Sequence, residues 1–262
     1  MWYSVNISFT IIYTRVIIVK KKNGRIISTS IVIIVLCCVV LVYSFFNGYS
    51  GLHLKKEVKK GQIKVACVGD SVTYGYGLED WHKTNYPAVL QTLLGDGYNV
   101  RNFGDSGKSV QNILFRDYSK TITYSQSIDY EADILVFMLG TNDSIPNYWE
   151  NEEVFKEQYL TLLDTYLVGE NPPRVYLCTP TRAFYKDKSQ TSGPAFMGIQ
   201  DDVVVKICEI VKEIAEERGC ECIDIYKLTK DHPEYYSSDM VHPNPHGAEE
   251  LAKEIYRNIK PE

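Results

Sequence analysis

Residues 63–71 have the sequence IKVACVGDS, an apolar run of strand length that ends in a glycine, an acid and a serine. A short apolar run bounded by turn residues is typical of a buried strand. Similar runs recur along the chain, and the predicted strands are 63–68, 99–103, 134–139, 175–179 and 222–226. Helical patterns lie between several of these strands, which predicts a parallel sheet covered by helices on both faces.

The predicted helices have apolar residues at three- and four-residue spacing, which gives each of them one apolar face. They span 86–94, 154–167 and 201–218, and a fourth helix closes the chain. Asn244 and Pro245 suit the cap and first position of that last helix. We therefore expect one domain over about residues 61–260.

Short polar motifs stand where predicted strands end or just before the last helix. They are 69–71 (GDS), 102–104 (NFG), 140–143 (GTND) and 239–242 (DMVH). In open α/β sheets, ligands bind beyond the carboxyl ends of the strands. We therefore expect the four motifs to share one rim of the sheet.

The four motifs together hold the residue types that acyl transfer needs. A serine hydroxyl such as that of Ser71 is a weak nucleophile unless an imidazole takes its proton and a carboxylate orients that imidazole. His242 and Asp239 are predicted to do this. The negative charge of a tetrahedral intermediate needs donors already in place, and the amides of Ser71 and Gly104 and the side chain of Asn142 are the candidates.

Each motif alone also has a structural interpretation. Asp70 or Ser71 can cap a helix, Gly104 can serve a tight turn, and Asn142 can bond its own backbone in a turn. His242 can be a loop residue without a catalytic role. The occurrence of all four motifs in one chain favours the catalytic interpretation.

The four motifs, in this order, resemble those of the SGNH hydrolases, the GDSL-type esterases and lipases, over about residues 61–260. The resemblance implies a flavodoxin-like three-layer α/β/α sandwich with five parallel strands. We expect no cofactor and no metal. The residues that the resemblance implies are the nucleophile Ser71, the base His242, its partner Asp239, and the oxyanion donors Ser71, Gly104 and Asn142. Asp70 and Asp143 are expected to support the two loops, and His246 is an alternative base.

The expected substrate is a short acyl ester, most simply an O-acetyl group, on a carbohydrate. Aromatic residues that suit stacking on sugars, or alternatively a packed lid, are Tyr74, Tyr76, Trp81, Tyr148, Trp149, Phe184, Tyr185 and Phe196. The stretches VYLCTP (175–180) and DHPE (231–234) resemble those of bacterial sialate or polysaccharide O-acetylesterases. Two alternatives are a lysophospholipase or thioesterase with the same triad, and an inactive membrane-tethered glycan-binding module.

The N-terminal part differs in composition from the rest. Residues 26–46 hold no formal charge, and about 20 such residues as helix cross a bilayer. We therefore predict a tail at 1–25, a transmembrane anchor at 26–46 and a lysine-rich stalk at 47–60. The basic cluster at 20–25 favours a cytoplasmic N-terminus and an extracellular catalytic domain. A cleaved signal peptide and a secreted domain are the alternative.

Charge and cysteine content exclude some functions. Residues 57–262 contain 21 basic and 33 acidic groups, a formal charge of −12, which disfavours binding to nucleic acid. The seven cysteines form no recognisable metal or disulfide pattern. The expected partners are thus a small-molecule or glycan ester and, through the anchor, a membrane. The sequence does not indicate an oligomeric state.

Overall fold

The computed structural model describes residues 57–113, 115–184 and 198–259. In this part of the chain, five strands form one sheet in the order β2-β1-β3-β4-β5, and all neighbouring strands are parallel. The strands are β1 (Ile63–Gly69), β2 (Tyr98–Gly104), β3 (Ile134–Met138), β4 (Arg174–Cys178) and β5 (Glu221–Ile223). This is the flavodoxin-like strand order. Strand β2 lies on one side of β1 and the later strands lie on the other side, and such sheets bind ligands at this switch point between β1 and β3.

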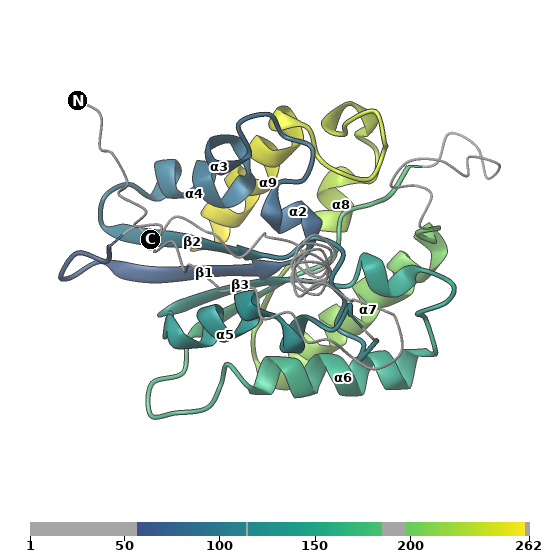
Figure 1. Cartoon of the computed structure of the whole chain (residues 1–262), viewed down its shortest axis with the longest axis horizontal. Helices are drawn as coiled ribbons and strands as arrows, with labels where there is room; N and C mark the ends of the chain where they lie inside the picture. The colour runs from purple at the N-terminus through teal and green to yellow at the C-terminus, as the bar shows by residue number, and fades with distance from the viewer. Residues whose placement is uncertain (1–56, 114, 185–197, 260–262) are drawn as a thin grey trace, which may run out of the picture. The chain divides into compact units, whose positions relative to one another are not determined.

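Helices cover both faces of the sheet, with α4 and α9 on one face and α5, α6 and α7 on the other (Figure 1). The α-helices are α2 (Ser71–Tyr74), α3 (Trp81–Thr84), α4 (Tyr86–Leu94), α5 (Ile122–Asp129), α6 (Glu152–Asp164), α7 (Asp201–Arg218), α8 (Ile225–Thr229) and α9 (Pro245–Ile259). The 3₁₀ turns within the described ranges are η2 (Tyr118–Lys120), η3 (Asn142–Ser144) and η5 (Pro233–Tyr235). The predicted three-layer α/β fold is therefore confirmed.

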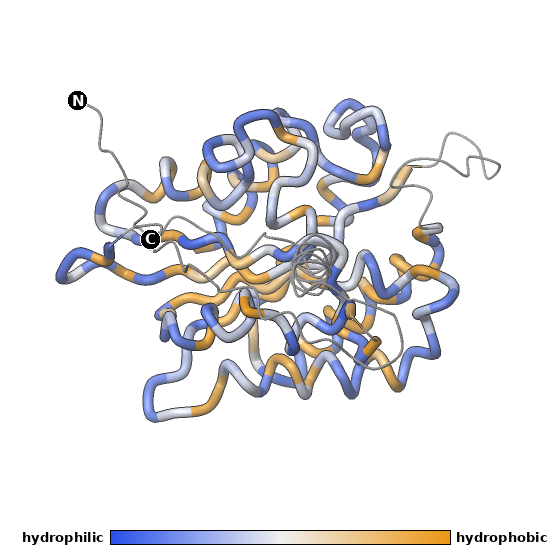
Figure 2. Tube along the Cα trace, viewed as in Figure 1, coloured by the Kyte–Doolittle hydropathy of each residue, from blue (hydrophilic) through white to orange (hydrophobic). Residues whose placement is uncertain are grey.

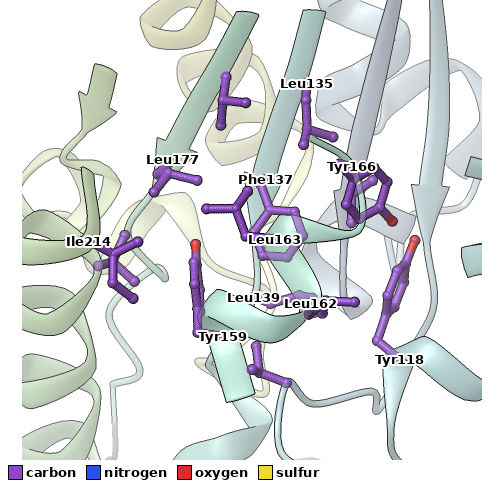
Figure 3. Close-up of a cluster of buried hydrophobic side chains, with 14 of the residues drawn as sticks. Tyr118, Leu135, Phe137, Leu139, Tyr159, Leu162, Leu163, Tyr166, Leu177 and Ile214 are labelled. Carbon is purple, nitrogen blue, oxygen red and sulfur yellow. The ribbon is translucent and has the colours of Figure 1, made fainter. Parts of the chain in front are cut away.

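The central strands of the sheet are hydrophobic (Figure 2), as expected for a sheet that is covered by helices on both faces. All five residues of β3 are buried. Leu135 and Phe137 pack with Tyr159 and Leu163 of α6 on one side (Figure 3), while Val136 packs with residues of α4 and α9 on the other. Alternate residues of one strand thus pack into two separate cores, one on each face of the sheet, and both cores hold the strand in place.

The last predicted strand needs correction, and one helix after β2 has no counterpart in the prediction. The predicted strand 222–226 stops at Ile223, because the carboxylate of Asp224 accepts a hydrogen bond from the amide of Lys227 and caps α8. Helix α5 was not predicted. Its buried residues are Thr123 and Ser127, and its first residue, Ile122, is exposed, so it lacks an apolar periodic pattern.

The predicted tail, the anchor at 26–46 and most of the stalk lie outside the described residues. Among the helices that are described, none is both long and apolar enough to cross a bilayer. The anchor remains a prediction from the sequence.

Candidate active site

Ser71 lies at the first position of α2, directly after β1. Asp70 is the N-cap residue, and its Oδ1 accepts a hydrogen bond of 2.9 Å from the amide of Val72. Gly69 is needed before this cap, because a Cβ atom there would lie 2.0 Å from Oγ1 of Thr73. The capping interpretation therefore holds for Asp70, and the cap places Ser71 at the carboxyl end of β1, next to the switch point between β1 and β3.

His242 and Asp239 occupy the loop before α9, and this loop brings them to Ser71. Nε2 of His242 lies 2.8 Å from Oγ of Ser71, and Nδ1 of His242 lies 2.9 Å from Oδ2 of Asp239. The other carboxylate oxygen of Asp239 accepts the amides of Val241 and His242, each at 2.9 Å. His242 is 6% exposed. The predicted contact between segments far apart in the sequence is present.

The carboxylate of Asp239 is suited to remain ionised. Burial raises its pKa, but the hydrogen bonds from His242 and from the two loop amides outweigh burial, and the pKa is lowered from its ordinary value. An ionised Asp239 accepts a hydrogen bond from Nδ1–H of His242, which leaves the lone pair of Nε2 directed at Ser71.

The Asn142 side chain lies close to the loop that follows β2. Its Nδ2 donates to the carbonyl oxygen of Lys108 at 2.8 Å, and the residue is buried in η3, just after β3. One of the two amide hydrogens of Asn142 is thereby used, and this bond fixes the orientation of the carboxamide. The second hydrogen stays available to an oxyanion.

Gly104 does not present a free amide. Its N–H donates to Oδ1 of Asn102 at 2.8 Å, which uses the donor assigned to it from the sequence. The glycine is required for another reason, since a Cβ at this position would lie 2.2 Å from the amide nitrogen of Tyr74. Gly104 therefore allows β2 to pack closely against α2, and its assignment as an oxyanion donor needs correction.

Gly107 is a better candidate for this donor in the same loop. In the described part of the chain, the amides of Ser106 and Gly107 donate no hydrogen bond, whereas the amide of Asp105 donates to Gly69. Gly107 has a φ of 76°, which favours glycine. It also directly precedes Lys108, whose carbonyl binds Asn142. The second glycine of NFGDSG, at 102–107, was the signal in the sequence.

Two further carboxylates are buried beneath the site. Oδ2 and Oδ1 of Asp143 accept the amides of Val110 and Gln111, at 3.1 and 2.8 Å. Burial raises the pKa of Asp143 to about 7, and burial likewise raises that of Asp70 to about 6. The hydrogen bonds of Asp143 tie the Asn142 turn to the loop after β2, which agrees with the supporting role predicted for it.

These raised pKa values predict a pH dependence of stability. An acid with a raised pKa in the folded state stabilises the fold fully below its unfolded pKa, and this stabilisation is lost as pH rises through the folded pKa. Between about pH 4 and 7 the free energy of unfolding should therefore fall. Asp143→Asn should reduce this fall by on the order of 1 kcal/mol or more, as measured by urea unfolding across that range. Parallel pH profiles for the two proteins would contradict the prediction.

The remaining histidines lie apart from the contact between Ser71 and His242. His246 is exposed, with Nε2 4.0 Å from the carboxylate of Glu250, so it is not the base in this arrangement. His232 pairs with Glu234, and His82 is exposed beside Trp81. Within the described ranges, no group of three acidic, histidine or cysteine residues is arranged to hold a metal ion.

Of the aromatic residues that the sequence suggested for stacking on a sugar, some lie at the candidate site and others pack on the core. The ring of Tyr76 lies 4.7 Å from that of His242 and the residue is 45% exposed, whereas Tyr74 stacks on Trp81. Trp149 packs partly on the core beside Phe155. Tyr185 and Phe196 lie outside the described residues. Among the described members of this set, Tyr76 is the one in ring contact with His242.

Comparisons with known proteins place these features in a family. The model of the GDSL-like Lipase/Acylhydrolase family matches residues 67–250. An acetylxylan esterase of Xylanibacter ruminicola is 33% identical over 220 residues, which cover 77% of this chain and 44% of the relative. The chain thus spans less than half the length of that relative.

Solved structures with the same fold include two esterases. A carbohydrate acetylesterase family member from Sinorhizobium meliloti has a TM-score of 0.64 at 19% identity, over 76% of this chain and 97% of that one. A putative arylesterase from Agrobacterium tumefaciens has a TM-score of 0.63 at 19% identity, over 76% and 98% of the two chains. At these identities the likeness establishes the fold alone.

Proposed function

The chain belongs to the GDSL-like lipase/acylhydrolase family, a family of carboxylic ester hydrolases, and we propose that it removes short acyl groups, above all acetyl, from a carbohydrate. The observation that carries the proposal is the continuous contact from Oγ of Ser71 through His242 to Asp239, with distances of 2.8 and 2.9 Å. Such a contact is what a serine nucleophile needs, and its presence argues against an inactive binding module.

The proposed reaction has two steps. His242 takes the proton of Ser71 while Oγ attacks the acyl carbonyl carbon, and the sugar oxygen leaves with that proton when its bond to the acyl carbon breaks. A water molecule then attacks the acyl-enzyme and gives a proton to His242. The bond between the acyl carbon and Oγ breaks, Oγ of Ser71 takes the proton from His242, and the carboxylic acid is released. In both steps the amides of Ser71 and Gly107 and the side chain of Asn142 stabilise the oxyanion.

The choice of acetyl and of a carbohydrate rests on two supporting observations. The relative that shares 33% identity is named an acetylxylan esterase, and a structure with the same fold is named a carbohydrate acetylesterase family member. The sequence resemblance of residues 175–180 and 231–234 points in the same direction. A lysophospholipase or thioesterase would use the same triad on a longer acyl chain.

An acyl-length series separates these functions. The purified protein should hydrolyse nitrophenyl acetate much faster than the palmitate, and it should release acetate from acetylated xylan. The opposite order, with turnover of palmitoyl esters and none of acetylated sugars, would overturn the proposal in favour of a lipid substrate.

Tyr76 is proposed to position the imidazole. Aromatic contacts of this kind contribute about 0.5–1.5 kcal/mol, so Tyr76→Ala should lower kcat/KM for nitrophenyl acetate about 2- to 12-fold. Tyr76→Phe keeps the ring and should restore the activity. If the phenylalanine variant is as impaired as the alanine variant, the ring contact is not the reason for the loss.

We also propose that the catalytic domain acts outside the cell. The support is the uncharged segment 26–46 with lysines and an arginine directly before it. An uncleaved anchor and a cleaved signal peptide both lead to this location.

A further inference from the structure

A cavity lies between the loop that follows β2 and the loop that follows β3, two loops that the hydrogen bond between Asn142 and Lys108 joins. It has a volume of about 360 Å³, within the usual range for a small ligand site. Its lining includes Gln111, Asn112, Asn147, Tyr148, Trp149 and Gln158. No step of the proposed reaction uses any of these side chains.

Hydrogen bonds connect the cavity to the reacting centre. The side chain of Asn142 binds the carbonyl of Lys108, and the carboxylate of Asp143 binds the amide of Gln111. These two bonds hold the loops together next to Asn142, the proposed oxyanion donor. Asn147 lies five residues after Asn142, so their Cα atoms are at most about 18 Å apart. A few linked sugar rings can bridge this distance.

Two neutral polar side chains of the cavity, those of Asn112 and Asn147, are available to a ligand. Oε1 of Gln158 on α6 accepts the amide of Asn112 at 2.7 Å, which orients the Gln158 carboxamide. The side chains of Asn112 and Asn147 are exposed and make no hydrogen bond to any other described residue. Carboxamides donate and accept at once, as sugar hydroxyls do.

The charge of the cavity favours an uncharged ligand. The lining holds one ionisable group with a formal charge, the carboxylate of Glu150, and no lysine or arginine. The nearby guanidinium of Arg116 lies over the ring of Tyr148, 5.0 Å from its centre. An acidic sugar would face Glu150 without a cation in the lining to pair with, and the surrounding chain is acidic overall.

We propose that this cavity is a subsite for a neutral sugar residue of the glycan that carries the scissile ester. The inference rests on the proposed esterase function and adds that the protein recognises a neutral oligosaccharide chain, not only the acyl group. Carboxamides from both loops would bind the hydroxyls, and Tyr148 and Trp149 would supply apolar contact area.

The test compares a substrate that reaches the cavity with one that does not. In Asn112→Ala/Asn147→Ala, KM for acetylated xylo-oligosaccharides should rise roughly 5- to 100-fold, the equivalent of losing two neutral hydrogen bonds. Hydrolysis of nitrophenyl acetate should stay as in the wild type. Asn171→Ala, an exposed asparagine in the loop before β4, is the matched control and should leave both substrates unaffected.

A binding measurement separates recognition from chemistry. Unacetylated xylo-oligosaccharide should bind Ser71→Ala in calorimetry, and the two asparagine substitutions should remove that binding. An unchanged KM and unchanged binding in the double variant would overturn the subsite while the esterase function stands. Preferential turnover of acetylated oligogalacturonate would overturn the neutral ligand. Failure of the proposed function itself is a different result, namely turnover of palmitoyl esters and none of acetylated sugars by the wild-type protein.

Discussion

Replacing Ser71 with alanine is expected to lower kcat for nitrophenyl acetate by at least about 10⁴-fold, because the substitution removes the atom that forms the acyl-enzyme. His242 and the oxyanion donors remain, so a small residual rate over the uncatalysed reaction should persist. Steady-state kinetics would show the loss, and a burst experiment on the wild type would detect the acyl-enzyme if its hydrolysis is the slow step.

The loss in Ser71→Ala should not come from unfolding. The side chain contributes the hydrogen bond to His242, and one such bond adds only about 0.5–1.5 kcal/mol to stability. Urea unfolding should therefore change little. Ser125→Ala, which alters an exposed serine on α5, is the control and should have wild-type kinetics. If Ser71→Ala kept a rate within tenfold of the wild type, the nucleophile assignment would be wrong.

Much of the fold could be predicted because its elements carry strong local signals. The predicted ranges 86–94 and 201–218 coincide with α4 and α7. Helix α4 has an asparagine cap and an early proline, while α7 buries a regular apolar stripe and ends at Gly219, whose φ of 62° stops the helix. In contrast, α5 is buried through hydroxyl groups, such as that of Ser127 bonded to Tyr166. No apolar period marks a helix of that kind.

The site was predictable in its chemistry and less so in its donors. Strand ends of a parallel sheet meet at one edge, so Ser71 and Asn142 had to lie near each other once the strand order was known. Which glycine amide is free is a different matter. The side chain of Asn102 folds back on the amide of Gly104, and a contact between residues two positions apart in the sequence is not visible in any apolar pattern.

The second large effect is expected from Asp239→Asn. An asparagine oxygen can still accept the amides of Val241 and His242, as Oδ1 of Asp239 does, so the loop should keep its shape. Its NH₂ group, however, would face Nδ1 of His242 and would favour the tautomer that carries the proton on Nε2. That nitrogen then donates to Ser71 and cannot take its proton. The same change in serine proteases lowers kcat by about 10⁴-fold, and we expect a similar loss here.

The control for Asp239→Asn is Asp231→Asn, because Asp231 is an exposed aspartate ahead of the same loop and its substitution should leave kcat unchanged. Ring nitrogen shifts of His242 in NMR give a readout that simple destabilisation of the fold would not reproduce: the proton should move from Nδ1 to Nε2 at a pH where the imidazole is neutral. An unchanged tautomer with a large loss of activity would show that Asp239 acts through its charge on the imidazolium. An unchanged rate would remove Asp239 from the mechanism, and the 2.9 Å contact with His242 would then be structural.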